Sequence, residues 1–426
     1  MSLSEEQQRA VDAVKAGKSI AIQASGGTGK SFTIDHFKTN DTIVIAPTAV
    51  AAVNVQGITC HSAFSLAHGL QTEKDLNRIT PDMSMMFGEG SPVDLLVFDE
   101  AFNIRADILD AIDYKLKLMR KNNLPFGGIQ VVLAGDCGQS IPIVDYRERK
   151  LFSSKYLTPF IFGSKVWKQL NPEVHVFTKI FRNANYEQQL MLSRIRMKDE
   201  TLIDGKPAYK VAVDYVNSIA RHGDTEDSEL HLTAYRDDAD KRNSLYYDAI
   251  KSKEYVYPAT IEGKFNSASA MVPQDLKLKE GVRVMFVVNN RDAGYINGTT
   301  GTVYRLSQDE ILVETDDGDI VNVEKHTWED VKYGVLGKSF TKIPTGKMKQ
   351  YPLMLAYSAT ISKVQGCTLA SATMDLGKRA FGCGMLFVGL SRLTDLKNLT
   401  LTRPINYNDV VVDRKAISFI RKNEHK

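Results

Sequence analysis

The stretch that decides the fold is ASGGTGKS at residues 24–31, which follows the apolar run SIAIQ at 19–23. It matches the phosphate-loop pattern GxxxxGK(S/T), except that Ala24 replaces the first glycine. In such a loop the glycines let backbone N–H groups curve around a phosphate, the lysine reaches the β- and γ-phosphates, and the last hydroxyl binds Mg²⁺. The sequence therefore predicts a strand, a phosphate-binding loop and a helix in that order. The predicted phosphate-binding residues are Gly26, Gly27, Thr28, Gly29, Lys30 and Ser31.

Around this loop, the first 180 residues have the pattern of a parallel sheet covered by helices. Apolar runs at 19–24, 42–46, 95–98 and 129–134 are each followed by polar or glycine-rich residues and then by a plausible helix. Strands buried on both faces have such continuous apolar runs, so we predict an α/β fold. The segment 65–92 interrupts the pattern, because it is polar, rich in Met and Gly, and lacks a clear strand. We interpret it as a small insertion out of the sheet.

A different pattern covers residues 281–323, where short β-like runs alternate with turn signals. The runs lie at 282–288, 301–306 and 311–314, and the turn dipeptides NG and DG lie at 297–298 and 317–318. This pattern predicts a small β-barrel inserted into a second α/β domain.

Composition sets the broad class of the protein. The chain has 426 residues, of which 43% are hydrophobic and 25% charged, and no run approaches the roughly 20 apolar residues of a membrane helix. The first residues, MSLSEE, do not have the form of a signal peptide, so we expect an intracellular protein, cytoplasmic if bacterial or phage-encoded. The four cysteines form no CxxC pair, which argues against zinc or a disulfide framework. A net charge of +3 does not by itself indicate nucleic acid.

Two further strand ends carry candidate catalytic side chains. VFDE at 97–100 ends in two carboxylates: Asp99 suits the hold on Mg²⁺ and Glu100 suits activation of a water. AGDCGQ at 134–139 closes another strand, and ligands of open α/β sheets bind at the carboxyl ends of strands. Gln139 could therefore contact the γ-phosphate or its water, although an ordinary loop glutamine has the same pattern.

An ordered set of motifs runs along nearly the whole chain and resembles the superfamily 1B helicases. It is most similar to the petite-integration-frequency (PIF-type) branch, with the RecD and phage Dda helicases as relatives. The motifs are LSEEQ at 3–7, APT at 46–48, TCHSAF at 59–64, FDEA at 98–101, GDCGQSIP at 135–142, FGSKVW at 162–167, FRN at 181–183, SKVQGCT at 362–368 and VGLSR at 388–392. The late motif has Ser362 where the family usually has His, and Ala101-Phe102 replaces a small polar pair.

The resemblance implies two RecA-like domains with ATP between them, a small wedge insertion and a Src-homology-like β-barrel insertion. The implied boundaries are 1–64 and 93–176 for domain 1A, 65–92 for the wedge 1B, 177–255 and 351–426 for domain 2A, and 256–350 for domain 2B with the barrel.

Residue roles also follow from the resemblance. Gln7 matches an adenine-reading glutamine, Arg182 and Arg392 match two arginines that contact the γ-phosphate, and Gln365 and Gly366 join the nucleotide-binding residues. Lys30, Glu100, Gln139 and the two arginines form the implied catalytic set. The implied DNA contacts are Thr48, His61, Ser62 and Phe64 from the first domain and Thr360 and Lys363 from the second. For His61 and Phe64 the alternative is a packed pair under the sheet.

The function implied is an ATP-dependent DNA helicase, with ATP and Mg²⁺ as cofactors, that moves 5′ to 3′ along single-stranded DNA and unwinds duplex. The expected partners are single-stranded DNA, tailed duplex DNA and a single-strand-binding or replication protein; we expect a monomer and no membrane. The alternative is a superfamily 1 RNA helicase or nucleoprotein remodeller. A third possibility is a P-loop protein that hydrolyses nucleotide slowly and acts as a switch. Such a protein needs no arginine from a second domain, so the presence of both FR at 181–182 and SR at 391–392 argues against it.

Overall fold

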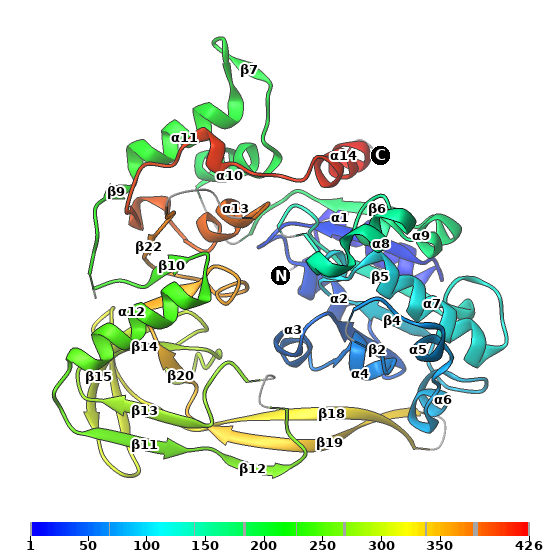
Figure 1. The fold of residues 1–426 in the computed structure, drawn as a ribbon, viewed down its shortest axis with the longest axis horizontal. Coiled ribbons are helices and arrows are strands. Elements are labelled where there is room, and N and C mark those ends of the chain that lie inside the picture. Colours follow the sequence, from blue (N-terminus) through cyan, green and yellow to red (C-terminus); the bar gives the residue numbers. More distant parts are fainter. Residues whose placement is uncertain are drawn as a thin grey trace. The chain divides into compact units, whose positions relative to one another are not determined.

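The computed structural model describes residues 2–424 except 68, 140, 182–184, 227, 267–269, 337–338 and 378–381. Contacts divide the chain into two compact units. The first comprises Met1–Phe181, Glu329–Gly346 and Asp413–Lys426, and the second comprises Arg182–Trp328 and Lys347–Val412. Figure 1 labels the helices and strands of both.

The first unit is built on a six-stranded parallel sheet in the order β3-β2-β4-β5-β1-β6. The strands are β1 (Ile20–Ala24), β2 (Thr42–Ala46), β3 (Ile58–Thr59), β4 (Leu95–Phe98), β5 (Gln130–Gly135) and β6 (Glu173–Phe177). Residues of β1, β2 and β4 are all buried, which explains why their sequences are continuous apolar runs. The four strands predicted from those runs are confirmed, and their carboxyl ends share one edge of the sheet.

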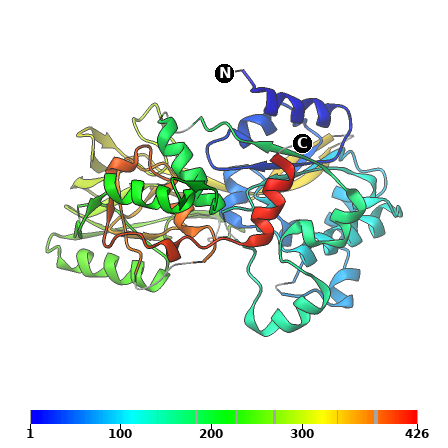
Figure 2. The ribbon, with the colours of Figure 1, turned by 90° about the horizontal axis from the view of Figure 1, so that it is seen from above.

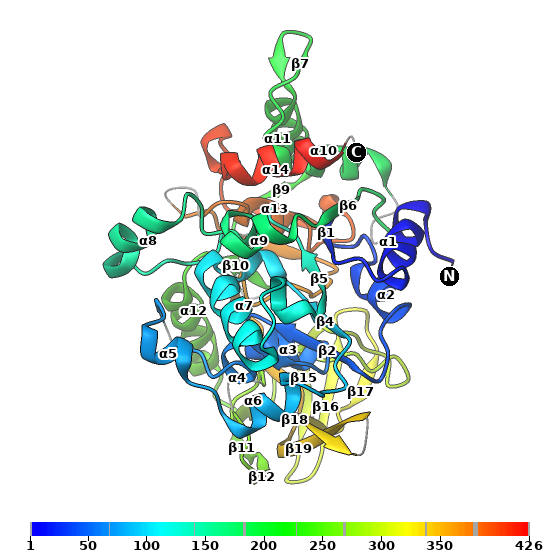
Figure 3. The ribbon, with the colours of Figure 1, turned by 90° about the vertical axis from the view of Figure 1, so that its right-hand side faces the viewer.

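Helices cover this sheet and form the insertion. They are α1 (Glu5–Lys15), α2 (Lys30–Asp35), α3 (Ala49–Asn54), α4 (Cys60–Ala63), α5 (Glu73–Asn77), α6 (Pro81–Phe87), α7 (Ala106–Arg120), α8 (Arg149–Lys155), α9 (Lys165–Leu170) and α14 (Arg414–Glu424). Within the described part of 65–92, the insertion has the two short helices α5 and α6 and no strand, as expected. Figures 1 and 3 show both helices beside α7.

The C-terminal helix α14 belongs to the first unit, whereas the predicted boundaries placed 351–426 in domain 2A. Its Phe419 ring stacks on Phe162 at 4.5 Å and lies 5.7 Å from the rings of Phe102 and Trp167. This cluster accounts for the departure Ala101-Phe102, because Phe102 is a buried core residue rather than part of a polar turn. Figure 2 shows α14, in red, beside the end of the first unit that contains β6.

The second unit has its own parallel sheet, in the order β21-β10-β22-β23-β9. The strands are β9 (Arg221–His222), β10 (His231–Thr233), β21 (Ser358–Thr360), β22 (Ala372–Met374) and β23 (Leu399–Leu401). Helices α10 (Tyr186–Met197), α11 (Ala208–Ile219), α12 (Arg236–Ala249) and α13 (Met385–Leu390) accompany it, with the hairpin β7 (Leu202–Ile203) and β8 (Lys206–Pro207). Two parallel α/β sheets agree with the predicted fold class.

An antiparallel sheet in the order β17-β16-β15-β14-β20 occupies the region predicted to be a barrel. It contains β14 (Arg283–Phe286), β15 (Thr300–Leu306), β16 (Ile311–Thr315), β17 (Ile320–Asn322) and β20 (Leu353–Leu355) around an apolar core. The remaining strands are β11 (Glu254–Pro258) paired with β13 (Asp275–Lys279), and β12 (Thr260–Gly263) in a sheet with β18 (His326–Leu336) and β19 (Ser339–Gln350). The long strands β18 and β19 were not predicted.

Candidate nucleotide and strand-binding site

The phosphate loop joins β1 to α2 in the predicted strand, loop and helix order. Gly27 and Gly29 have φ values of +85° and +80°, which favour glycine, and Gly29 is the N-cap of α2. The Thr28 hydroxyl donates to Ser25 O at 2.8 Å, and Phe181 N donates to Gly27 O at 2.8 Å. The loop is therefore held by one internal hydrogen bond and by one from Phe181, and Ser31 at its end is exposed.

Lys30 lies between the two predicted carboxylates at the end of β4. Its Nζ is 2.7 Å from Asp99 Oδ1 and 2.6 Å from Glu100 Oε1. Burial alone would lower the pKa of Lys30, but the charges of Glu100 and Asp99 outweigh it and raise the pKa above its ordinary value. The lysine is thus a fixed cation at the carboxyl edge of the sheet.

The two carboxylates differ in their surroundings. Asp99 is 5% exposed, and its Oδ1 lies 2.7 Å from Lys30 Nζ, which leaves carboxylate lone pairs for a further ligand. Glu100 has φ +51°, an uncommon conformation for a side-chain-bearing residue, and begins the turn into the 3₁₀ helix Ala101–Asn103. Oxygen ligands such as a buried carboxylate and a serine hydroxyl are those that Mg²⁺ prefers, and Ser31 directly follows the lysine that pairs with Asp99.

Gln23 is a site residue that the sequence reasoning missed. It is buried within β1 and donates through Nε2 to Asp136 Oδ1 at 2.7 Å, and its Oε1 accepts from Cys137 N at 3.1 Å. These bonds fix the loop that carries Gln139, which is 6% exposed. The signal was present: a fully buried strand rarely carries an amide side chain unless both its groups are paired.

Gln7 contacts the phosphate loop directly. Its Nε2 donates to Thr28 O at 3.0 Å, and its Oε1 accepts from Ser4 N at 2.9 Å in a capping box that starts α1. A Cβ at Gly29 would lie 2.5 Å from Gln7 Nε2, so this approach requires glycine. Each amide group of Gln7 thus has one partner in the protein, which leaves a second N–H and a second lone pair for another ligand.

The predicted strand contacts of the first unit follow β2 and β3. Thr48 is exposed, and its hydroxyl caps α3 by accepting from Ala51 N at 3.2 Å. His61 is half-buried and Ser62 is exposed on α4. Phe64 is 0% exposed and stacks on Phe87 with ring centroids 4.7 Å apart. Phe64 therefore lies in the packed position that was the alternative to a strand contact.

In the second unit, Thr360 ends β21 and pairs with Thr233 at the end of β10. Its hydroxyl accepts from Lys363 N at 3.3 Å, and the Lys363 side chain is exposed. Gln365 is half-buried, and Gly366 has φ +94°. These residues of the late motif gather at the carboxyl end of the sheet.

Of the two predicted arginines of the second unit, the structure describes Arg392. Arg392 is 2% exposed and donates to Val388 O at 2.9 Å and Ser391 Oγ at 2.8 Å within the turn that ends α13. Arg182 lies outside the described residues.

Comparison with known proteins identifies the family. A model of the PIF1-like helicases matches residues 2–197, and a model of the Pif1 DNA helicase 2B domain matches 266–306. The chain is similar to "ATP-dependent DNA helicase Pif1" of Bdellovibrio bacteriovorus, with 28% identity over 100% of this chain and 93% of that protein. The chain belongs to the PIF1-like helicase family.

Solved structures of PIF1-like helicases agree. The structure of Bacteroides sp Pif1 in complex with ADP-AlF4 superposes with a TM-score of 0.90 at 28% identity, covering 100% of this chain and 98% of that one. The Bacteroides Pif1 structure with ADP-AlF3 and single-stranded DNA superposes with a TM-score of 0.68 at 28% identity, covering 100% and 98%. The predicted fold and the predicted enzyme class, an ATP-dependent DNA helicase, are thus confirmed.

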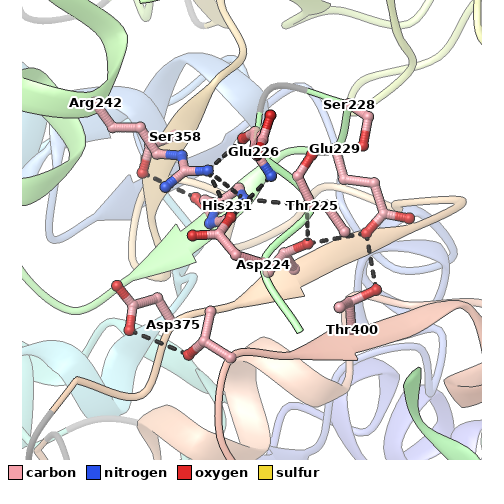
Figure 4. Close-up of polar contacts among 12 residues, drawn as sticks. Asp224, Thr225, Glu226, Ser228, Glu229, His231, Arg242, Ser358, Asp375 and Thr400 are labelled. Atoms are coloured by element: carbon pink, nitrogen blue, oxygen red, sulfur yellow. Dashed lines mark hydrogen bonds and ion pairs between the residues drawn. The ribbon is translucent and has the colours of Figure 1, made fainter. Parts of the chain in front are cut away.

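A second polar cluster of this PIF1-like helicase lies in the second unit and has no place among the predicted site residues (Figure 4). His231 Nε2 lies 2.8 Å from Arg242 and 3.1 Å from the Thr225 hydroxyl, and burial, with Arg242, lowers the pKa of His231 to about 4. Buried Glu229 accepts from the Thr400 hydroxyl at 3.1 Å. His231 begins β10, so the cluster belongs to the amino end of that strand, and we interpret it as a structural anchor for the preceding loop.

The described residues set two further limits. No described helix is both long and apolar enough to cross a membrane. No group of three or more His, Cys, Asp or Glu side chains among the described residues could form a metal cluster, and the four cysteines form no disulfide with one another.

Proposed function

We propose that this PIF1-like helicase hydrolyses ATP to move 5′ to 3′ along single-stranded DNA and to unwind duplex DNA ahead of it. The observation that carries the chemistry is the Lys30, Asp99 and Glu100 constellation at the carboxyl edge of the first sheet. The direction of movement rests on the family resemblance, and the DNA substrate on what the similar proteins are named for.

Each nucleotide-site residue has a distinct proposed task. Lys30, with its raised pKa, binds the β- and γ-phosphates, which replace Glu100 as its partners. Glu100 is then released to orient the attacking water, and Gln139 senses the γ-phosphate from a loop that Gln23 holds. The backbone of Gly26, Gly27, Thr28 and Gly29 supplies the phosphate cradle.

Ser31 and Asp99 fit a bound Mg²⁺, because one offers an exposed hydroxyl and the other a buried carboxylate that pairs with Lys30 and keeps further acceptor capacity. When bound, Mg²⁺ would neutralise charge on the β- and γ-phosphates. We further propose that Arg392 and Arg182 supply positive charge to the γ-phosphate during hydrolysis. Gln7 would contact the adenine, and Gln365 and Gly366 the nucleotide.

The strand contacts proposed for DNA are Thr48, His61 and Ser62 in the first unit and Thr360 and Lys363 in the second. Hydroxyls and a lysine at strand ends are suited to phosphate oxygens, which carry sequence-independent binding. Phe64 is no longer among them. The segment 65–92 is the proposed wedge that meets the duplex junction.

We also propose that the protein acts as a monomer inside the cell, in the cytoplasm if it is bacterial or phage-encoded. Its proposed partners are tailed duplex DNA and a single-strand-binding or replication protein. Roles in DNA replication, repair or recombination would follow from such partners.

The decisive experiment measures ATPase activity with no strand, with single-stranded DNA and with RNA, followed by unwinding of 5′-tailed and 3′-tailed duplexes. We expect stimulation by DNA and unwinding from the 5′ tail only. Unwinding from the 3′ tail alone would refute the proposed direction, and stimulation by RNA alone would favour an RNA helicase or nucleoprotein remodeller.

A further inference from the structure

The carboxylate of Glu148 links the first turn of the insertion 65–92 to a segment that leads from the nucleotide edge of the sheet. Its Oε1 accepts from Leu70 N at 2.7 Å, and its Oε2 accepts from Arg105 at 3.0 Å. Arg105 is fixed in turn by Asp107 at 2.7 Å and lies 5.5 Å above the Phe152 ring. The Arg105 and Glu148 side chains are 12% and 23% exposed, so water screens this pair less than a surface pair.

The turn that meets Glu148 is shaped for this contact. Gly69 has φ +91°, and a Cβ at that position would lie 2.3 Å from Glu148 Oε1. The Gln71 side chain closes the same turn, because it accepts from Ala67 N at 3.1 Å and donates to Ala67 O at 2.7 Å. The Leu70 N–H group is therefore held toward the carboxylate before any ligand binds.

Both partners of the ion pair lie on segments that leave the nucleotide site. Arg105 follows Glu100 across the single 3₁₀ turn Ala101–Asn103 and precedes α7. Glu148 ends the 3₁₀ helix Tyr146–Glu148 in the loop after Gln139. The residues proposed to orient the water and to sense the γ-phosphate thus lead to the same ion pair.

The rest of the insertion is held differently, by cations of α7 that donate to backbone carbonyls. Buried Lys115 donates to Asp75 O at 2.6 Å and Arg78 O at 2.7 Å. Arg120 donates to Phe87 O and Val93 O, each at 3.2 Å. These contacts fix the body of the insertion to one helix, whereas Glu148 fixes its first turn to the two nucleotide-site segments.

We infer that Glu148 is a positioning residue for strand separation, which sets the orientation of the insertion through Leu70 N–H and couples it to the segments of Glu100 and Gln139. The inference rests on the proposed role of 65–92 as the wedge. It requires no contact between Glu148 and nucleotide or DNA.

The test compares Glu148→Ala with Glu148→Gln in the full chain, with Glu89→Ala as the control. Glu89 lies in the same insertion, and its exposed side chain forms an ion pair with Lys121 at 3.3 Å. Three quantities are measured: single-strand-stimulated ATPase, base pairs unwound per ATP on a 5′-tailed duplex, and hydrogen exchange at the Leu70 amide.

For Glu148→Ala we expect ATPase close to wild type, faster exchange at Leu70 and about a fivefold loss of base pairs unwound per ATP, the effect of removing one hydrogen bond. Glu148→Gln keeps an oxygen that can accept from Leu70 N and should restore most of the unwinding and the exchange protection. Glu89→Ala should change none of the three quantities.

Unchanged unwinding per ATP in Glu148→Ala, despite faster Leu70 exchange, would overturn the inference. Equal losses in Glu148→Ala and Glu148→Gln would also overturn it, because the Leu70 contact would then not be the one that matters. Failure of the wedge proposal itself has a different signature: an acidic substitution at the exposed Met85 of the insertion would leave unwinding intact.

Discussion

The carboxyl edge of the first sheet and the insertion 65–92 lie in the same unit but are organised in opposite ways. At the sheet edge, short motifs place Lys30 between Asp99 and Glu100, and each residue type has a chemical reason to be there. In the insertion, the local sequence determines two capped helices and little else. Its position depends on Lys115 and Arg120 of α7 and on Glu148.

The comparison teaches that these two regions should respond differently to substitution. A change at the sheet edge removes a chemical step, because no neighbouring group can replace a phosphate-binding cation or a water-orienting carboxylate. A change at the residues that anchor the insertion should leave ATP hydrolysis intact and reduce the unwinding obtained from each ATP. Substitutions at the sheet edge should therefore abolish ATPase activity, whereas substitutions at the insertion's anchors should reduce unwinding and spare ATPase activity.

The largest effect is expected for Lys30→Ala. Hydrolysis should fall to background with or without single-stranded DNA, because the described loop offers no other cation to the β- and γ-phosphates. The variant also leaves Asp99 and Glu100 as neighbouring charges without their shared partner. Steady-state ATPase checks this, with Lys18→Ala as the control, since Lys18 is an exposed lysine before β1 that pairs with Glu173 at 3.1 Å. Near-normal turnover would disprove the phosphate-site assignment.

Glu100→Gln should come next. The amide preserves the shape of the side chain but cannot act as the carboxylate base, so turnover should fall by ~10²–10⁴ while ATP and DNA still bind. Single-turnover hydrolysis and equilibrium nucleotide binding separate the two effects. Asp99→Asn is the companion variant, expected to show a weaker response to Mg²⁺. Normal turnover in Glu100→Gln with a dead Asp99→Asn would reverse the two roles.

The strands of the nucleotide edge could be predicted from the sequence because their signals are local. Four apolar runs became β1, β2, β4 and β5, and Lys30, Glu100 and Gln139 each follow the end of one of these strands. Gln23 escaped because its role lies in bonds to Asp136 and Cys137, which are far away in the sequence.

The misplaced residues share a physical cause, which is long-range packing. Phe64 follows a pattern that suits either base stacking or a core position, and only its partner Phe87, supplied by α6, decides between them. The C-terminal helix gives no local sign that Phe419 will pack beside Phe162 and Phe102. Periodicity defines which face of a helix is apolar, but it does not define the surface on which that face packs.

Lys115→Met tests how the anchoring of the insertion 65–92 to α7 contributes to unwinding. The substitution removes the donor that ties the Asp75 and Arg78 carbonyls to α7, and one lost hydrogen bond of this kind costs ~0.5–1.5 kcal/mol. We expect faster proteolysis within 65–92 and reduced unwinding, with ATPase retained. Limited proteolysis followed by mass spectrometry locates the effect. Lys121→Met is the control, because Lys121 is 80% exposed and lies just after α7. Loss of ATPase in Lys115→Met alone would show that the two regions are not separable.

The smallest effect is expected for Met85→Asp, which should leave the fold unchanged and reduce unwinding alone. Replacing all of 65–92 by a flexible linker is a poor test, because Met83, Met86 and Phe87 are buried and Phe87 covers Phe64. Met85 is 40% exposed on α6, so its side chain can be changed without opening the core that its neighbours fill.

Among the described residues of the insertion, Met85 is the large hydrophobic side chain that remains exposed, so it is the candidate to contact the terminal base pair. A carboxylate there would oppose the approach of DNA phosphates and remove the apolar contact, while the buried face of α6 keeps Met83 and Phe87 in place. We expect ATPase and thermal stability close to wild type, and unwinding of a 5′-tailed duplex reduced by about three- to tenfold. Met85→Leu is the matched control, because it keeps an apolar side chain at the same exposed position and should unwind normally. If Met85→Asp unwinds as fast as wild type while Lys115→Met does not, the insertion supports strand separation through its placement rather than through this face. The strand-separating surface would then have to be sought on the antiparallel sheet of β14 to β17.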